Sequence, residues 1–283
     1  MTGKTLEPAD DITHLSQESF ERLAQFITRE LGIKMPDCKL SMVQSRLLRR
    51  VRELGMESVE QYGEYFLKGA SEEERVHLID AITTNKTDFF REPVHFQYLT
   101  TRVLPQLRPG MCKFWSAGCA TGEEPYTLAM VLSEYAARTA GFSFSILATD
   151  VSTRVLERAK MGIYDELLAA PIPPVLRSRY LLRGREDGQK LVRIAPALRN
   201  RVSFHRLNFM DRDYPVRDRF EAIFFRNVMI YFDRPTQEAV IEKLCRHLVP
   251  GGYLFVGHSE SLTGLNVPVT PVDAAVFRKM ESR

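Results

Sequence analysis

Two adjacent carboxylates follow a loop of small residues in the stretch KFWSAGCATGEEPY (113–126). Glycines after a strand usually cradle a phosphate at a helix N-terminus, and a dinucleotide loop has the pattern GxGxxG. This loop has one glycine fewer, and Glu123 and Glu124 would repel a pyrophosphate. We therefore expect a cofactor without phosphate, with Glu124 as a candidate ligand and Glu123 as a helix-capping charge. The alternative is that both carboxylates only stabilise the helix dipole.

Asp150 ends the next apolar run, FSFSILATD, and is the second chemically suggestive residue. An acidic residue at this strand end can accept both hydroxyl hydrogens of a ribose, a contact that serves any adenosine-type cofactor, including NAD. A ribose combined with a cationic amino-acid tail and no phosphate fits the first loop better. S-adenosylmethionine has these properties.

Two further segments carry polar residues next to apolar ones. Asn227 closes the buried run EAIFF in a position suited to ligand contact, although a plain turn asparagine is the alternative. In TTNKTDFFRE (83–92), Asn85, Thr87 and Arg91 surround two phenylalanines. That segment could equally be an interdomain hinge anchored by its aromatic side chains.

The elements that must position these residues belong to an α/β fold. Apolar runs of strand length begin at residue 113 and alternate with helical patterns at 124–139, 153–161 and 236–248. This alternation predicts a doubly wound parallel sheet covered by helices on both faces. The expected strands are KFWSA, FSFSILATD, RVSFHRLNF, RFEAIFFRN and GGYLFVG. In such a sheet, ligands bind outside the carboxyl ends of the strands.

The first part of the chain has only helical patterns, with Ser16 and Asp37 as expected caps and Ser71 and Glu74 at capping-box spacing. Pro93 suits the first turn of a connecting helix. A polar turn between RYLLRG and KLVRI predicts a small β insertion. The expected organisation is an N-terminal tail (1–14), a helical domain (15–88), a linker with a connecting helix (89–112) and an α/β domain (113–283) that contains the inserted β-subdomain (177–203).

Composition excludes several classes of protein. The 283 residues are 44% hydrophobic and 27% charged with a net charge of +3, which is ordinary for a globular chain and does not suggest nucleic-acid binding. The four scattered cysteines show no zinc spacing and indicate free thiols, so no metal is expected. The polar N-terminus and the lack of a membrane-length apolar run predict a soluble, cytoplasmic protein.

Five segments in order carry a specific resemblance: TTNKTDFFRE, WSAGCATGEEPYTLAM, ATDVSTRVLERAKMGIY, FRNVMIYFD and GGYLFVGHSESL. They resemble the CheR-type methyltransferases of bacterial chemotaxis over nearly the whole chain from about residue 15. The resemblance implies a helical domain before an S-adenosylmethionine-dependent methyltransferase domain with an inserted antiparallel β-subdomain. It also implies methyl transfer to glutamates of methyl-accepting chemotaxis receptors, which gives glutamate 5-O-methyl esters and S-adenosylhomocysteine.

The resemblance also implies site residues. The cofactor contacts would be Asn85, Thr87, Arg91, Glu124, Asp150, Asn208, Phe209, Asn227 and Val228. The family more often has leucine at the position of Phe209, and phenylalanine should serve equally as an apolar wall for adenine. Arg91 and Tyr231 resemble residues near the transferred methyl, although Tyr231 could instead pack in the core.

Methyl transfer from a sulfonium to a glutamate carboxylate is an in-line displacement that needs no general base, because the carboxylate is already ionised near pH 7. Orientation and desolvation should supply most of the catalysis. A basic arc on the second helix, which is otherwise an ordinary solvated face, would meet the acidic methylation region of the receptor in this family. Its members are Lys39, Arg46, Arg49 and Arg50.

The remaining expectations concern partners and alternatives. The β insertion could bind a C-terminal receptor peptide as an added strand, and the sequence leaves this undecided. We expect a monomer without membrane insertion, recruited to receptor arrays. The alternatives are a methyltransferase for another protein or non-protein acceptor, a module that binds S-adenosylmethionine without turnover, and, third, a dehydrogenase. The Val-Met-Ile-Tyr run after Asn227 disfavours an amino-adenine methyltransferase, which would have Asn-Pro-Pro-aromatic there.

Overall fold

The computed structural model describes residues 12–186 and 188–280. The chain divides into two compact units, of which the first ends at Thr84 and the second begins at Asn85. Residues 89–112, expected as a linker and connecting helix, fold with the second unit, and so do residues 85–88, which were expected in the helical domain.

The first unit is helical, as its sequence pattern predicts. Its helices are α1 (Gln17–Leu31), η1 (Asp37–Lys39), α2 (Leu40–Glu53), α3 (Val59–Leu67) and α4 (Glu72–Ile82). Ser16 caps α1 by accepting the N–H of Ser19, and Gly32 ends it with a left-handed φ of 69°. Ser71 caps α4 by accepting the N–H of Glu74.

Two details of this unit differ from the sequence expectation. Asp37 does not cap α2, because residues 37–39 form a 3₁₀ turn and the Asp37 carboxylate accepts a hydrogen bond from Gln17. The Glu74 carboxylate turns inward and bonds to Arg50 and the Tyr62 hydroxyl. Both carboxylates accept hydrogen bonds from residues far away in the sequence, and the spacing of helix-capping residues does not reveal such partners.

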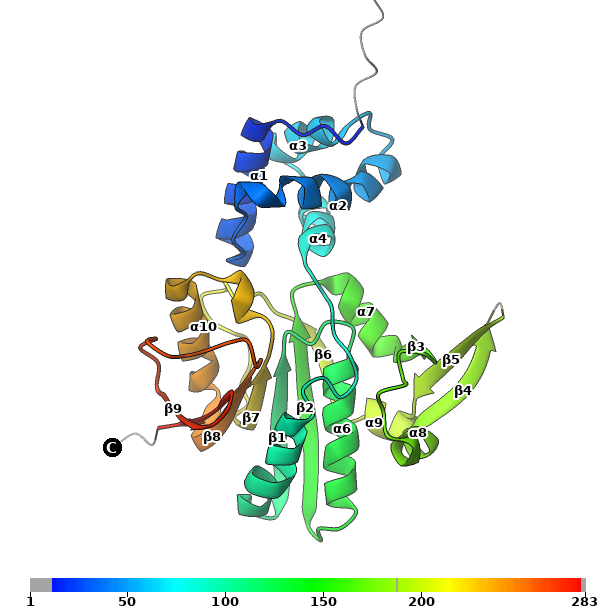
Figure 1. Cartoon of the computed structure of the whole chain (residues 1–283), viewed down its shortest axis with the longest axis vertical. Coiled ribbons are helices and arrows are strands. Elements are labelled where there is room, and N and C mark those ends of the chain that lie inside the picture. Colours follow the sequence, from blue (N-terminus) through cyan, green and yellow to red (C-terminus); the bar gives the residue numbers. More distant parts are fainter. Residues whose placement is uncertain (1–11, 187, 281–283) are drawn as a thin grey trace, which may run out of the picture. The chain divides into compact units, whose positions relative to one another are not determined.

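The second unit contains a seven-stranded sheet in the order β6-β2-β1-β7-β8-β10-β9 (Figure 1). The first five strands of that order are parallel, and β10 is antiparallel to β8 and β9. Their bounds are β1 Gly110–Ala117, β2 Phe142–Asp150, β6 Val202–Arg206, β7 Phe220–Phe225, β8 Leu248–Val256, β9 Val269–Asp273 and β10 Val276–Lys279. The predicted doubly wound sheet is confirmed, and an antiparallel edge is added to it.

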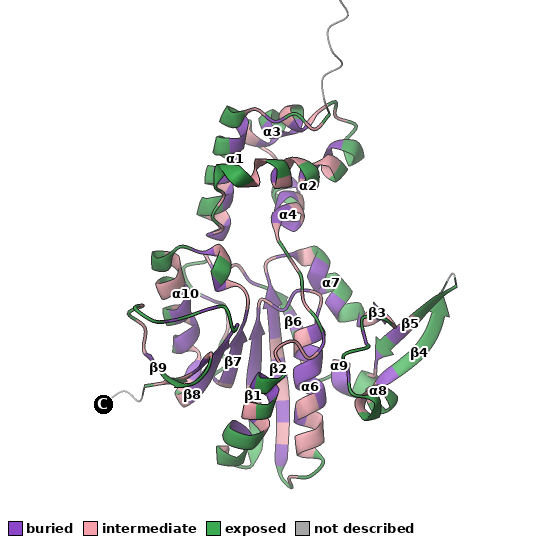
Figure 2. Ribbon diagram, in the orientation of Figure 1, coloured by how far each residue is buried: buried purple, intermediate pink, exposed green. Residues whose placement is uncertain are grey.

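Helices cover the sheet and its central strands are buried (Figure 2). The helices are α5 (Val94–Tyr98), which continues as the π-helical turn η2 (Leu99–Val103) and the 3₁₀ turn η3 (Leu104–Gln106), then α6 (Glu123–Ala136), α7 (Thr153–Met161) and α10 (Arg234–Arg246). Pro93 precedes the first of these, as expected. Chain order runs outward from β1 on either side, so the switch point lies between β1 and β7.

A second, three-stranded sheet is antiparallel, in the order β3-β5-β4. Its strands are β3 (Ile163–Asp165), β4 (Leu181–Glu186) and β5 (Gln189–Ile194). Helix α8 (Pro174–Tyr180) lies between β3 and β4 in the chain, and α9 (Pro196–Arg199) follows β5. In Figure 1 its hairpin extends away from the main sheet. None of the helices in the described part of the chain has the length and apolar character needed to span a bilayer.

Candidate active site

The expected cofactor residues of the sheet lie where strands β1, β2, β6 and β7 end. Parallel strands have their carboxyl ends at one edge, so the loops that follow them share that edge. Gly118–Glu124 follows β1, Asp150 ends β2, Asn208 and Phe209 follow β6, and Asn227–Tyr231 follows β7.

Gly118 explains why the first loop needs a small residue. Its φ is 86°, and a Cβ there would lie only 2.6 Å from Cγ2 of Val228 and 4.0 Å from Cε2 of Phe209. The loops after β1, β6 and β7 therefore meet at this point. Phe209 is itself buried and its ring meets that of Phe225 edge-on at 5.0 Å, so it forms a fixed apolar surface.

Asp150 is buried and accepts two backbone hydrogen bonds. Its Oδ2 accepts the N–H of Ala120 at 2.9 Å, and its Oδ1 accepts the N–H of Ser152 at 3.0 Å. An ionised carboxylate has about four acceptor positions and can accept several hydrogen bonds at once. Asn208 uses its side-chain oxygen locally, on the N–H of Met210 at 3.0 Å.

The two glutamates of the first loop have different surroundings. Glu124 accepts the Ser116 hydroxyl at 2.7 Å on Oε1 and Arg226 Nη1 at 3.0 Å on Oε2. Its burial raises the pKa, and the guanidinium of Arg226 opposes that shift. Glu123 lies in the first turn of α6, as expected for a helix-terminal charge. It is buried, which raises its pKa, and it accepts the Thr121 hydroxyl at 2.6 Å.

The segment before α5 has an unusual backbone on both sides of Arg91. Phe90 and Glu92 have φ values of 55° and 52°. Residues other than glycine rarely adopt such values, and those that do cluster at functional sites. The Phe90 N–H donates to the Thr127 hydroxyl at 3.1 Å, and Arg91 Nη1 donates to the carbonyl of Lys86 at 3.1 Å. Asn85 and Thr87 are half-buried in this segment.

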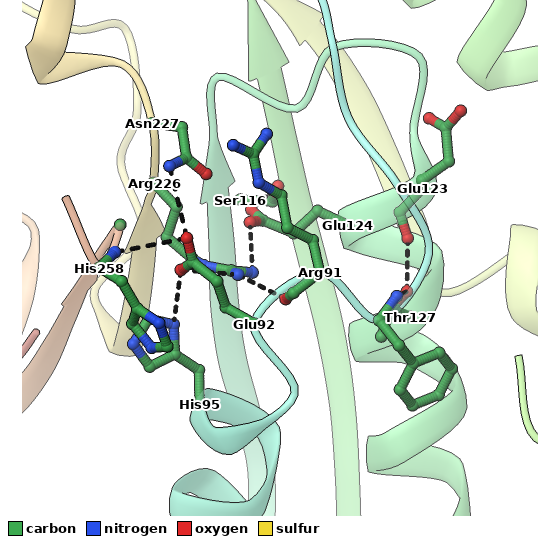
Figure 3. Close-up of polar contacts among 12 residues, drawn as sticks. Arg91, Glu92, His95, Ser116, Glu123, Glu124, Thr127, Arg226, Asn227 and His258 are labelled. Atoms are coloured by element: carbon green, nitrogen blue, oxygen red, sulfur yellow. Dashed lines mark hydrogen bonds and ion pairs between the residues drawn. The ribbon is translucent and has the colours of Figure 1, made fainter. Parts of the chain in front are cut away.

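Arg226 is a central residue that the sequence analysis missed. Its side chain is 2% exposed and forms ion pairs of 3.0 Å with both Glu92 and Glu124 (Figure 3). Nη2 also donates to the carbonyl of Arg91 at 2.5 Å. Arg226 therefore ties the β7 loop to α6 and to the segment around Arg91. An arginine inside the run EAIFFRN was the available signal, because a buried guanidinium requires carboxylate partners.

Asn227 lies between two carboxylates. Its φ is 60°, its N–H donates to Glu260 Oε2 at 2.8 Å, and its Nδ2 lies 3.5 Å from Glu92 Oε1. Tyr231 ends the 3₁₀ turn η4 (Met229–Tyr231), which follows directly, and is half-buried. Core packing therefore does not enclose the whole Tyr231 side chain.

Glu92, His95 and His258 place three potential metal-ligand atoms within 4.8 Å of one another, the one such group found in residues 12–186 and 188–280. Burial lowers the pKa of His95 to about 4, so its ring is neutral at pH 7. Burial favours the neutral form of Glu92, but Arg226 and the surrounding hydrogen bonds outweigh it and lower the pKa. Because Arg226 already balances the charge of Glu92, a bound cation would meet a positive neighbour. That no metal binds stays a prediction.

The four basic residues expected to meet the substrate lie in the helical unit and differ in availability. Arg49 is exposed and pairs with Glu53 at 2.8 Å. Lys39 Nζ donates to the carbonyl of Lys34 at 2.7 Å, and Arg46 bonds to the carbonyl of Ile82 and to the Thr84 hydroxyl.

Arg50 is held by the interior of the helical unit. Its side chain is 18% exposed and grips the buried Glu74 through Nε at 2.9 Å and through Nη2 at 2.5 Å. Glu74 also accepts the Tyr62 hydroxyl at 2.9 Å. The arc therefore combines a side chain that fastens α2 to α4 with one, Arg49, that faces water.

The fold and the site together define an α/β methyltransferase. The match to the family model "CheR methyltransferase, SAM binding domain" covers residues 85–277, and the match to "CheR methyltransferase, all-alpha domain" covers residues 18–83. The chain belongs to the CheR methyltransferase family. It is an S-adenosylmethionine-dependent methyltransferase of chemotaxis.

Named relatives agree over most of the chain. A chemotaxis protein methyltransferase of Klebsiella aerogenes is 40% identical over 94% of this chain and 90% of its own length. One from Escherichia coli is 39% identical over 89% and 87%, and one from Borreliella burgdorferi is 36% identical over 94% and 95%.

Proposed function

We propose that this chain transfers the methyl group of S-adenosylmethionine to glutamate side chains in the cytoplasmic domains of chemoreceptors, forming 5-O-methyl esters. The observation that carries the proposal is the convergence of Asp150, Phe209 and Val228 at one sheet edge, beside the network that joins Arg91 to Arg226. The protein would work in the cytoplasm, at receptor arrays, as a monomer.

The cofactor fits the residues at this edge. Asp150 would take the ribose hydroxyls, Phe209 and Val228 would wall the adenine, and the acidic first loop would reject a phosphate. Asn85, Thr87, Arg91, Glu124, Asn208 and Asn227 are the other proposed contacts. Glu124 has both oxygens engaged by protein donors, so we assign it mainly to holding the loop. When bound, S-adenosylmethionine supplies a methyl group activated by its sulfonium.

The contribution of the chain itself is to position the acceptor carboxylate. A glutamate carboxylate needs no base at neutral pH, so the chain has to orient it and exclude water. Arg91 would hold the carboxylate of the acceptor or of the cofactor, and Tyr231 would line the transfer site. Two left-handed residues flank Arg91, and its carbonyl is bonded to a buried arginine, which limits its movement.

Receptor recognition would use the basic arc formed by Arg46, Arg49 and Arg50 on α2 and by Lys39 at the end of the preceding turn η1. Arg49 is the exposed member. Attraction to an acidic methylation region would act on substrate affinity and on its salt dependence. The hairpin β4–β5 offers a second contact. β4 is an edge strand whose residues after Leu181 are exposed, and Arg183 and Arg185 lie on it. A receptor C-terminal peptide could add there as a strand.

The chemistry of the product tests the proposal against a methyltransferase for another acceptor. The protein is incubated with methyl-labelled S-adenosylmethionine and a receptor cytoplasmic domain, and the labelled receptor is treated with mild alkali. A carboxyl ester hydrolyses and releases the label. Label that survives alkali would indicate an N-methyl product. Binding of S-adenosylmethionine without any transfer would favour a module that binds the cofactor without turnover.

A further inference from the structure

Glu260 is a buried carboxylate in the GHSE segment after β8, where it accepts several backbone N–H groups. Oε2 accepts the N–H of Gly257 at 2.6 Å and that of Asn227 at 2.8 Å. Oε1 accepts the N–H of Ile230 at 3.3 Å. Glu260 is 8% exposed. Burial raises its pKa, and the backbone hydrogen bonds oppose that shift. A buried carboxylate is costly unless hydrogen bonds compensate it, and the backbone N–H groups of this segment and of the β7 loop provide that compensation.

The groups that Glu260 binds belong to the loop after β7. Asn227 has a φ of 60°, a left-handed conformation that asparagine adopts more readily than most residues other than glycine. The backbone bond from Asn227 to Glu260 and the side-chain contact of Asn227 with Glu92 hold it from two sides. Ile230, one residue before Tyr231, is held by the same Glu260 carboxylate.

Gly257 provides the room for this arrangement. A Cβ at Gly257 would lie 2.5 Å from Nδ2 of Asn227 and 2.9 Å from Oε2 of Glu260. The absence of a side chain at Gly257 therefore lets the β7 loop and the Glu260 carboxylate pack directly against the end of β8. The contact between the β7 loop and Glu260 is made by protein groups alone.

We propose that Glu260 is a positioning residue for methyl transfer, because its carboxylate fixes the loop that presents Asn227, Val228 and Tyr231. This inference rests on the proposed function, which assigns those three residues to the cofactor and the transferred methyl. Glu260 acts through the backbone of the loop, and its oxygens face N–H groups of the protein.

Glu260→Gln is the sharpest variant because it keeps the size of the side chain. The amide retains one acceptor oxygen and replaces the other with an NH₂ group, which cannot accept an N–H bond. At least one backbone N–H of Gly257, Asn227 or Ile230 then loses its acceptor. Loss of a buried hydrogen bond to a charged group corresponds to at least about a tenfold change in an equilibrium that depends on the loop.

Calorimetry with S-adenosylhomocysteine measures the cofactor site without any acceptor. We expect Glu260→Gln to bind at least about tenfold more weakly, and kcat with a receptor domain to fall further. Glu157→Gln, an exposed glutamate on α7, controls for the loss of charge and should bind normally. Phe144 is a buried residue near the start of β2, far from the carboxyl ends of the strands where the site lies. Phe144→Leu removes core volume there and therefore controls for general instability.

An NMR measurement on the unaltered chain keeps the inference testable even if Glu260→Gln does not fold. Amide shifts of Gly257 and Asn227 should move together as the carboxylate is protonated, and affinity for S-adenosylhomocysteine should fall over the same pH range. Amides that stay still while the affinity falls would overturn the inference. So would normal binding and turnover by Glu260→Gln. An unaltered chain that does not bind the cofactor at all would instead contradict the proposed function.

Discussion

The guanidinium of Arg226 lies 3.0 Å from the carboxylate of Glu124, and both side chains are almost fully removed from water. Glu92 completes the arrangement on the other side of Arg226, also at 3.0 Å. A buried cation with two carboxylates is stable only while all three remain, because any one left alone is an uncompensated buried charge. This group connects the β7 loop to the first loop and to the segment around Arg91.

Removal of the Arg226 side chain should therefore make the second unit less stable against unfolding. We expect Arg226→Met to lower the free energy of unfolding by about 3–5 kcal/mol, because Glu92 and Glu124 lose their partner. Arg246→Met is the control, because Arg246 and Glu242 form an exposed i,i+4 pair and such pairs contribute little to stability. Urea unfolding followed by the fluorescence of the single tryptophan, the buried Trp115, measures both. Equal losses would show that the Arg226 network does not stabilise the unit.

Arg91 should affect turnover more than cofactor affinity. Arg91→Ala is expected to lower kcat for receptor methylation at least about 100-fold, since loss of one positioned charge at a reacting centre has effects of this size. Arg102→Ala, an exposed arginine in the same unit, should leave kcat unchanged. Initial rates at saturating S-adenosylmethionine give the comparison. Normal turnover by Arg91→Ala would remove Arg91 from the site.

His95 predicts a pH dependence of stability. Its pKa is lowered from 6.5 to about 4 by burial first and by Arg226 second, while Glu92 opposes the shift and His258 and Asp273 have smaller effects. Above pH 6.5 the ring is neutral in both states. Between pH 6.5 and 4 the unfolded chain binds the proton and the native chain does not. Stability is therefore lost as pH falls through this window, by up to about 3 kcal/mol.

The variant His95→Gln isolates this contribution, because glutamine does not titrate. Its unfolding free energy should fall less steeply than that of the unaltered chain between pH 6.5 and 4.5. His77→Gln, in the helical unit, should keep the original slope. Urea unfolding of the Trp115 signal at several pH values tests this. An unchanged slope in His95→Gln would mean that His95 takes up its proton over the same pH range in the native and the unfolded chain, and would contradict the lowered pKa.

The basic arc of α2 separates into two roles that mutation can distinguish. Arg49→Glu should raise KM for the receptor several-fold and reduce its salt dependence, with affinity for S-adenosylhomocysteine intact. Arg50→Glu should instead destabilise the helical unit by about 2 kcal/mol, less than for a fully buried pair because Arg50 is partly exposed. Receptor-methylation kinetics at two salt concentrations and circular dichroism unfolding measure the two effects. Equal kinetics for Arg49→Glu and the unaltered chain would exclude Arg49 from receptor binding.

The sequence predicted elements well where hydrophobic periodicity was strong. The strand at 142–150 and the helix at 153–161 have the expected bounds. Strand β3 has only three residues, and β9 and β10 are short with one buried residue each, so none of them forms an apolar run. Their pairing depends on partners elsewhere in the chain, which a local pattern does not contain.

The site was predicted unevenly for a physical reason. Residues that follow buried strands, such as Asp150 and Asn227, stand out because a polar side chain interrupts an apolar run. Glu92, Arg226 and Glu260 lie in the same motifs, but their importance comes from meeting one another or the β7 loop after folding. The sequence shows the charge of each one and not its partner.

Mass spectrometry of a receptor cytoplasmic domain, after incubation with S-adenosylmethionine and this protein, tests the central claim most directly. Peptide fragmentation locates each added methyl group on a particular side chain. We predict methyl groups on glutamate side chains, and far fewer of them in the same incubation time when Arg91→Ala replaces the unaltered protein. Methyl groups on lysine, arginine or a chain terminus, or an unmodified receptor together with normal cofactor binding, would contradict the account.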